Sequence, residues 1–215
     1  MKAAIFDMDG TLLDSMWMWR TVLVRYLNHL NIENAEELEK GVTMMGFMEA
    51  MEYIVAHADV GMTAEELFAD MKKYILHIYE TQIELKPYVK EYLTRLSKAG
   101  VHLSIATLTD RFMVEAVLKK VGIWDLFDYV ITVPEIGVMK NEPDIYEDCL
   151  AHAGCEKKDA VVFEDASYCL ETAHNAGFIC YGIADPWQEM TEAFKAKYCD
   201  RFLNDFGELL DEEIE

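Results

Sequence analysis

Six polar residues of this chain have side chains that suit phosphate and metal chemistry, and each follows an apolar segment. Carboxylate oxygens are hard ligands of the kind that Mg²⁺ prefers. A Lys ammonium can neutralise phosphoryl oxygens, and a Thr hydroxyl can donate a hydrogen bond to one of them. A carboxylate can also act as a nucleophile toward phosphorus. These candidate residues are Asp7, Asp9, Thr107, Lys140, Glu164 and Asp165.

The positions of these residues predict one shared site. They follow apolar segments 2–6, 101–106, 129–132 and 160–163, each of which reads as a strand. Ligands of open parallel sheets bind at the carboxyl ends of the strands. Four carboxylates at one edge would repel each other unless a divalent cation lay among them, so the sequence predicts a Mg²⁺ site there. Gly10 would let the backbone approach the ligand closely.

The elements that would position this site alternate along most of the chain. Besides the four segments above, strands are expected at 178–183 and, more weakly, at 201–203. Helices are expected near 111–121, 143–153, 167–176 and 188–197. Apolar strands alternating with helices are typical of a parallel sheet covered on both faces. The expected fold is therefore α/β, with a Rossmann-like parallel sheet as its core.

A helical segment interrupts this alternation after the first strand. Apolar residues recur at helical spacing over 16–30 and 44–55, and capping signals begin further helices at Asn34 with Glu37 and at Thr63 with Glu66. We therefore expect an inserted all-helical cap domain over 16–85. The core domain would comprise 1–15 and 86–215.

Each signal has a structural explanation when it is taken alone. Asp-x-Asp-Gly after a strand is often only a turn, and Thr107 could cap a helix. Lys140 could be a solvated surface residue, and Glu164 with Asp165 could cap the following helix. The order of all these residues on successive strand ends is much harder to explain by structure alone.

The same residues resemble the motifs of the haloacid dehalogenase superfamily. Residues 7–15, Asp-Met-Asp-Gly-Thr-Leu-Leu-Asp-Ser, are similar to its first motif, and Thr107 fits the second. Lys140, three residues before Pro143, fits the third, and Glu164-Asp165 fits the fourth. The likeness covers nearly the whole chain. The helical insert resembles the cap of the β-phosphoglucomutase-like subgroup.

The resemblance implies a role for each matching residue. Asp7 would attack phosphorus and form an aspartyl-phosphate, and Asp9 would protonate the leaving oxygen and then activate water. Thr107 and Lys140 would hold the phosphoryl oxygens. Mg²⁺ would be bound by Asp7, the Asp9 carbonyl and Asp165, with Glu164 in support. Two positions depart from the usual pattern: Ala166 stands where Ser is frequent, and Pro87-Tyr88 stands where Pro-Gly is usual.

A Mg²⁺-dependent phosphatase acting on a small phosphate monoester, either a sugar phosphate or a nucleotide-like ester, is the leading functional hypothesis. A sugar-phosphate mutase is the alternative. Its subgroup carries a phosphate-clamping Arg after Lys-Gly-Val-Ser, whereas this chain has Met44 after Lys-Gly-Val-Thr. Phosphonate hydrolysis would need a cap lysine that residues 16–30 lack, and dehalogenation needs neither Asp9 nor the metal set. A catalytically silent binding protein is the alternative from another class.

The side chains that would select the substrate are harder to predict. Several large apolar residues of the insert could line its side of the cleft, although packing inside the insert is the better explanation for most of them. Leu108, beside Thr107, is the core candidate. The insert candidates are Trp17, Trp19, Met44, Met45 and Phe47.

Composition limits the partners. The 215 residues carry a formal net charge of −21. This charge repels polyanions, so neither nucleic acid nor an anionic membrane is an expected partner. We find no apolar run long enough to cross a membrane and no signal peptide, and we expect a cytoplasmic protein that is a monomer or a weak dimer.

Overall fold

The computed structural model describes residues 1–43 and 45–214, and the chain divides into two units. One unit comprises Met1–Met16 and Ile83–Glu215, and the other comprises Trp17–Gln82. The first strand thus belongs to the same unit as the second half of the chain, and the helical segment is inserted between them.

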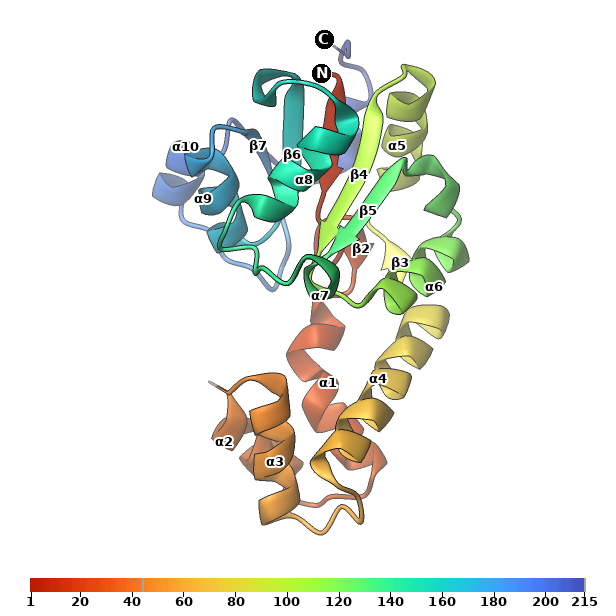
Figure 1. Ribbon diagram of the computed structural model, residues 1–215, viewed down its shortest axis with the longest axis vertical. Helices are drawn as coiled ribbons and strands as arrows, with labels where there is room; N and C mark the ends of the chain where they lie inside the picture. The colour runs from red at the N-terminus through yellow and green to blue at the C-terminus, as the bar shows by residue number, and fades with distance from the viewer. Residues whose placement is uncertain (44, 215) are drawn as a thin grey trace. The chain divides into compact units, whose positions relative to one another are not determined.

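A six-stranded parallel sheet forms the centre of the larger unit (Figure 1). Its spatial order is β5-β4-β1-β6-β7-β8, so that β1 lies between β4 and β6. Phe6 of β1 is paired with Ile105 on one side and with Phe163 on the other, and this register brings the ends of three strands level. The strands are β1 (Ala3–Phe6), β4 (His102–Thr107), β5 (Tyr129–Thr132), β6 (Ala160–Glu164), β7 (Ile179–Ile183) and β8 (Arg201–Leu203).

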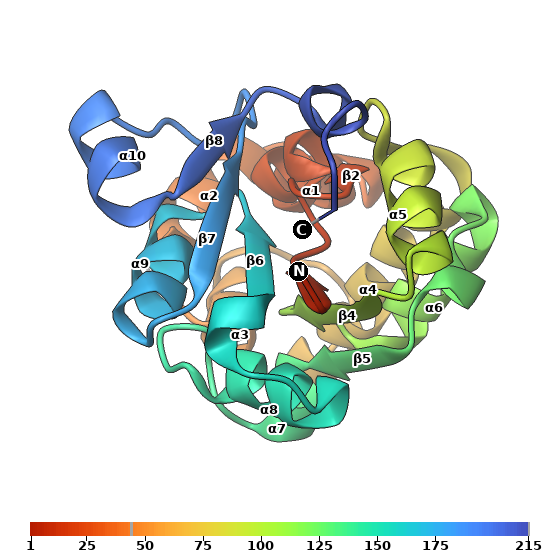
Figure 2. The same cartoon turned by 90° about the horizontal axis from the view of Figure 1, so that it is seen from above.

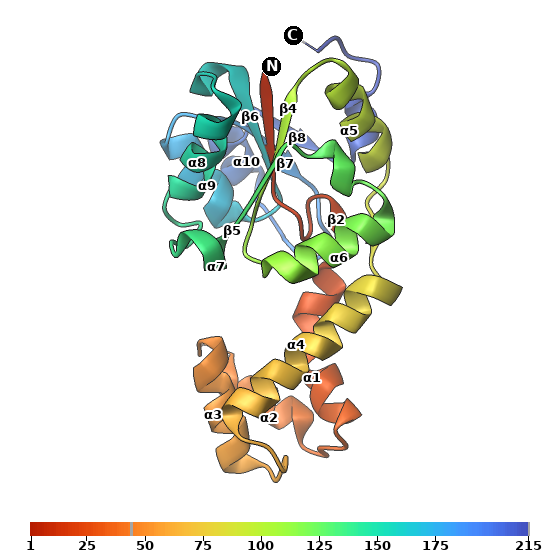
Figure 3. The ribbon, with the colours of Figure 1, turned by 45° about the vertical axis from the view of Figure 1, so that its right-hand side comes forward.

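Helices cover both faces of this sheet. α8 (Asp144–Ala153) and α9 (Ser167–Asn175) pack on one face, with α10 (Glu192–Tyr198) beside α9, and α5 (Val89–Lys98) packs on the other (Figures 2 and 3). α6 (Arg111–Val121) is on the side of α5 in Figure 3. All residues of β1 and β6 are buried, as expected for central strands covered on both faces. The shorter elements are α7 (Val133–Ile136) and the 3₁₀ turns η1 (Trp124–Leu126), η2 (Lys157–Asp159) and η3 (Phe206–Leu209).

The smaller unit is helical. It contains α1 (Met16–His29), α2 (Ala35–Val42), α3 (Phe47–His57) and α4 (Ala64–Thr81), with the first residue of α1 assigned to the larger unit. α4 begins with the expected capping box between Thr63 and Glu66. α2 also begins where expected, with Asn34 as its N-cap residue, but no side-chain cap hydrogen bond forms there.

The predicted fold class is confirmed, both for the parallel α/β core and for the inserted helical cap. All six expected strands are present, with ends within one residue or so of the expected ones. The short elements were not predicted: α7, the 3₁₀ turns η1, η2 and η3, and the two-residue strands β2 (Leu13–Asp14) and β3 (Glu84–Leu85). β2 and β3 pair antiparallel, so they join the two segments between which the helical unit is inserted. Two residues are too few to show an alternating pattern.

Tyr88 has an unusual backbone conformation at the start of α5. Its φ of 63° and ψ of 6° lie in the left-handed region, which glycine adopts with little strain. Tyr88 is also the residue at which the sequence departs from the expected Pro-Gly. The Tyr88 ring is half-exposed and lies so close to Gly207 that a Cβ on that glycine would meet it at 2.8 Å.

Among the residues that the structure describes, no helix combines the length and the apolar character that a membrane-crossing segment needs.

Candidate active site

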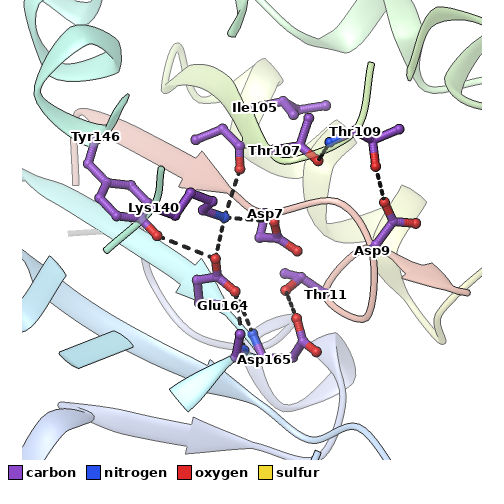
Figure 4. A network of polar contacts seen from close by, with 12 residues as sticks. Asp7, Asp9, Thr11, Ile105, Thr107, Thr109, Lys140, Tyr146, Glu164 and Asp165 are labelled. Atoms are coloured by element: carbon purple, nitrogen blue, oxygen red, sulfur yellow. Dashed lines mark hydrogen bonds and ion pairs between the residues drawn. The ribbon is translucent and has the colours of Figure 1, made fainter. Parts of the chain in front are cut away.

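Lys140 lies at the centre of a buried cluster at the carboxyl edge of the sheet (Figure 4). Its side chain is fully buried, and its Nζ is 2.7 Å from an Asp7 carboxylate oxygen. The same Nζ contacts Glu164 and donates to the Ala106 carbonyl oxygen at 3.0 Å. A lysine is rarely buried to this degree unless it is paired, so these contacts exclude the surface-lysine explanation.

Glu164 is held by four donors. Its Oε1 accepts from Lys140 Nζ and from the Tyr146 hydroxyl, which is 3.3 Å away. Its Oε2 accepts from the backbone N–H groups of Asp165 and Ala166 at 3.0 and 3.3 Å. Both oxygens are therefore occupied, and Glu164 fixes the position of the Lys140 ammonium.

Only one oxygen of the Asp165 carboxylate has a hydrogen-bond donor. Its Oδ1 accepts from the Thr11 hydroxyl at 3.1 Å, whereas its buried Oδ2 has no hydrogen-bond partner among the described residues. Gly10 makes room for this carboxylate, because a Cβ at Gly10 would lie 2.3 Å from Asp165 Oδ2. With φ of 86°, Gly10 also has a backbone conformation that other residues rarely adopt.

A divalent cation fits this arrangement. Asp7, Glu164 and Asp165 each offer a carboxylate oxygen, and these oxygens lie within 4.8 Å of one another. Hard oxygen ligands of this kind suit Mg²⁺, and the unpaired Asp165 Oδ2 is the atom that a cation would satisfy. Because both Glu164 oxygens already have donors, Asp7 and Asp165 have more freedom to bind a cation.

The Asp9 carboxylate is not in this cluster. Its Oδ1 accepts from the Ser15 hydroxyl at 2.6 Å, and its Oδ2 accepts from the Thr109 hydroxyl at 2.7 Å. Figure 4 shows Asp9 beside Thr109, on the other side of Asp7 from Lys140. Two hydroxyl donors thus hold the Asp9 side chain on the far side of Asp7 from Lys140, outside the group of Asp7, Glu164 and Asp165.

Burial and like charge disturb the pKa values of the cluster. Burial, followed by the charge of Glu164, raises the pKa of Asp7 to about 7, although Lys140 opposes the rise. Burial and the charges of Asp7 and Glu164 raise the pKa of Asp165 well above its usual range. Burial alone would lower the pKa of Lys140, but Asp7 and Glu164 outweigh burial and raise it. The site therefore has an excess of negative charge that a cation would relieve.

Thr107 is the last residue of β4 and is buried. Its hydroxyl oxygen accepts from the Thr109 backbone N–H at 3.2 Å. It does not cap α6, whose N-cap is Asp110. Leu108 is 42 % exposed, so its side chain is accessible beside the cluster.

The cap candidates belong to the helical unit. Trp19 packs within that unit, because its Nε1 donates to the Tyr79 hydroxyl at 3.1 Å. The Arg25 guanidinium lies 4.9 Å from the centre of the Trp17 ring. Met45 is half-buried, whereas Phe47 is 58 % exposed. Met44 lies outside the described residues.

The family model of haloacid dehalogenase-like hydrolases matches residues 4–183, which include every residue of the cluster. The chain belongs to this family. The predicted superfamily and the hydrolase class are thereby confirmed, and the carboxylate and lysine cluster lies at the strand ends where the motifs of the haloacid dehalogenase superfamily predicted it.

Two phosphatases are among the family members similar to this chain. The validoxylamine A 7′-phosphate phosphatase of Streptomyces hygroscopicus subsp. limoneus is 28% identical over 182 residues, which cover 85% of each chain. The fructose-1-phosphate phosphatase YqaB of Escherichia coli is 29% identical over 177 residues, covering 80% of this chain and 91% of YqaB.

Solved structures of haloacid dehalogenase-like proteins share the fold. CbbY from Rhodobacter sphaeroides, solved in complex with phosphate, aligns with a TM-score of 0.77 at 24% identity, over 97% of this chain and 96% of CbbY. A candidate β-phosphoglucomutase from Thermotoga maritima aligns with a TM-score of 0.82 at 21% identity, over 98% and 97% of the two chains.

Four site residues had no role assigned from the sequence. They hold the carboxylates: Thr11 holds Asp165, Ser15 and Thr109 hold Asp9, and Tyr146 holds Glu164. Thr11 and Ser15 lie inside the first haloacid dehalogenase motif, so their types were visible. Only the folded backbone shows which carboxylate each hydroxyl reaches.

Proposed function

We propose that this protein is a Mg²⁺-dependent phosphatase that hydrolyses a small phosphate monoester through a phosphorylated Asp7. The buried cluster of Asp7, Glu164 and Asp165 around Lys140 carries the proposal. Three buried carboxylates with one buried ammonium suit a site that takes a cation and a phosphoryl group together. A site that served only for packing would not bury these charges, because removing them from water costs free energy.

The names of the similar proteins support a sugar or polyol phosphate as the substrate class. Validoxylamine A 7′-phosphate, fructose 1-phosphate and hexitol phosphates are the substrates named for three of them. All three are polyhydroxylated monoesters. We therefore prefer this class to a nucleotide-like ester.

Asp7 is the proposed nucleophile. Its carboxylate attacks phosphorus, a new O–P bond forms, and the bond from phosphorus to the leaving oxygen breaks. Lys140 contacts Asp7, so its charge would lie beside the phosphoryl oxygens during this transfer. The Thr107 hydroxyl would donate a hydrogen bond to one of those oxygens.

Asp9 is the proposed acid and base. It would give a proton to the leaving oxygen in the first step and take one from the attacking water in the second. The hydroxyls of Ser15 and Thr109 hold both of its carboxylate oxygens, which fixes the orientation of the group that must move the proton.

Mg²⁺ would be held by Asp7, Asp165 and the Asp9 carbonyl oxygen, with Glu164 acting through Lys140. When bound, the cation would neutralise charge on the transferring phosphoryl group. Thr11 would orient Asp165 for this role, and Gly10 would leave the space that its carboxylate needs.

A phosphate-release screen tests the proposal. Purified protein is incubated with sugar phosphates, polyol phosphates and nucleotides, with Mg²⁺ or with excess EDTA, and Asp7→Asn serves as the matched inactive control. We expect Mg²⁺-dependent release from at least one sugar or polyol phosphate. Full activity in EDTA would contradict the metal assignment. Binding of esters with no release from any of them would favour the silent binding protein instead.

A further inference from the structure

Lys86 and Asp185 form a second buried ion pair that the proposed chemistry does not use. Lys86 Nζ lies 2.9 Å from Asp185 Oδ2, and the two side chains are 10% and 0% exposed. Lys86 Nζ also donates to the Ala184 carbonyl oxygen at 2.8 Å, and Asp185 Oδ1 accepts from the Trp187 backbone N–H at 2.9 Å. A buried pair costs desolvation energy, so its position requires an explanation.

This pair lies next to the catalytic edge. Glu164 at the end of β6 is paired with Gly182 of β7, so Asp165 is level with Ile183, and Asp185 follows two residues later. A chain of contacts also runs from Asp165 to Lys86. Asp165 accepts from Thr11, and the next residue, Leu12, accepts through its carbonyl oxygen from the Lys86 backbone N–H at 2.9 Å.

The two carboxylates share one further property. Asp165 Oδ2 and Asp185 Oδ2 are the two buried side-chain oxygens or nitrogens without a hydrogen-bond partner in the described chain. Lys86 faces Asp185 at ion-pair distance without an aligned hydrogen bond. Burial is the main cause of the raised pKa of Asp165, and the charge of Lys86 opposes that rise while the charge of Asp185 adds to it.

We propose that Asp185 is a positioning residue for the metal site, because it holds the Lys86 ammonium away from Asp165 and cancels its charge. The proposal rests on the proposed function. With Asp185 present, the pair is neutral and Asp165 Oδ2 stays available to the cation. Without it, a buried cation stands beside the metal carboxylates, and Asp165 is the acceptor that still lacks a donor.

A double-mutant cycle read by Mg²⁺ binding tests this proposal. Asp185→Asn leaves Lys86 charged and unpaired, and we expect the Kd for Mg²⁺ to rise by about tenfold or more, because an uncompensated buried ammonium beside the metal carboxylates repels the cation. The double variant with Lys86→Met and Asp185→Asn replaces a neutral pair by a neutral pair, so we expect its Kd to return to within about threefold of wild type. Titration calorimetry with Mg²⁺ alone measures both values.

A structural role would make the double variant as weak as the single one, and unchanged binding by Asp185→Asn would also overturn the proposal. If Asp185→Asn does not fold, Lys86→Met replaces it and should bind Mg²⁺ as tightly as wild type or more tightly. Weaker binding by Lys86→Met would overturn the proposal. Failure of the wild type to bind Mg²⁺ would overturn the proposed function itself.

Discussion

At the residue scale, the site depends on charged side chains that are buried close together. Glu164 accepts hydrogen bonds from four donors, one of which is Lys140, whereas Asp165 keeps one oxygen without a donor. Both oxygens of the Glu164 carboxylate thus have hydrogen-bond donors, whereas only one oxygen of the Asp165 carboxylate has one. This difference separates a residue that positions its neighbour from a residue that can bind a cation, and it can be tested by substitution.

Asp7→Asn should abolish turnover while the fold is kept, because an amide cannot attack phosphorus as a carboxylate does. We expect less than about a hundredth of the wild-type rate. Beryllium fluoride, a phosphoryl mimic, should be trapped on Asp7 of the wild type and not by the variant. A variant that retains a larger share of the rate, measured as phosphate release, would contradict the covalent route.

The raised pKa of Asp7 predicts how pH affects stability in chelator-treated protein. Between about pH 4 and 7 the folded state holds a proton on Asp7 more often than the unfolded state. The free energy of unfolding should therefore fall as pH rises, by up to about 1.4 kcal/mol per pH unit for one group. The Asn side chain of Asp7→Asn does not titrate. The free energy of unfolding of this variant, relative to wild type, should therefore grow by roughly 2 kcal/mol from pH 5 to pH 7.

Urea unfolding in EDTA at several pH values measures this difference. Asp125→Asn is the matched control, because Asp125 is exposed and belongs to no part of the site. The control should follow the wild-type pH profile. Parallel profiles for wild type and Asp7→Asn would contradict the raised pKa of Asp7.

Asp165→Asn should separate metal binding from stability. Mg²⁺ at about 100 times its Kd should stabilise the wild type by about 2.7 kcal/mol, which corresponds to a Tm rise of roughly 5–10 °C. The variant should lose this rise. In EDTA it should melt at a higher temperature than wild type, because it removes a buried carboxylate that lacks a full set of partners. Thermal melts with and without Mg²⁺ test both statements, and an unchanged Mg²⁺ shift would contradict the assignment of Asp165.

At the element scale, the sequence predicted those parts of the fold that have a repeating pattern. Strands such as residues 160–163 are continuous apolar runs between turn signals, and helices such as 111–121 repeat at three to four residues. β2 and β3 are too short to repeat, and they depend on pairing between residues 13–14 and 84–85. Asn34 is compatible with a cap, but the folded chain leaves its side chain without that hydrogen bond.

The site, like the fold, could be predicted only in part. Residue type and position after a strand were enough to predict that Asp7, Lys140, Glu164 and Asp165 share one site. They could not show that Lys140 is fully buried or that Glu164 serves it, because these properties depend on side chains from several strands and from α8. Partners far apart in sequence, such as Lys86 and Asp185, leave no local pattern at all.

Tyr88 offers a test at the junction between β3 and α5. Its φ of 63° costs about 1–2 kcal/mol for a residue with a Cβ. Tyr88→Gly and Tyr88→Ala both remove the ring, so their comparison isolates the backbone effect. We expect the Gly variant to be more stable than the Ala variant by about 1 kcal/mol in urea unfolding, after the greater freedom of unfolded glycine is included. Equal stability, or a more stable Ala variant, would contradict the strain.

At the scale of the whole molecule, the net charge of −21 contrasts with a substrate that is itself anionic. Long-range attraction cannot bring such a substrate to this protein. Recognition would therefore depend on local positive charge, supplied by Lys140 and by a bound cation. This contrast favours small esters, which Lys140 and one bound cation can neutralise locally.

The last prediction is that the protein hydrolyses its substrate and does not isomerise it. A mutase must hold a bisphosphorylated intermediate and present its second phosphate to the same aspartate, and this requires a cationic clamp such as a bidentate Arg. The resemblance to β-phosphoglucomutases places Met44 where those proteins have that Arg. Lys40, Arg20 and Arg25 are the cap cations that could replace it.

Without a clamp, the intermediate should leave and water should take the phosphoryl group from Asp7. The protein should therefore release inorganic phosphate from monoesters and should not convert β-glucose 1-phosphate to the 6-phosphate. Both products are measured in the same Mg²⁺-containing reaction, with Asp7→Asn as the blank. Isomerised sugar phosphate in excess of free phosphate would show that the mutase interpretation is correct. In that case, replacing Lys40, Arg20 and Arg25 one at a time by Met would identify the cation that acts as the clamp.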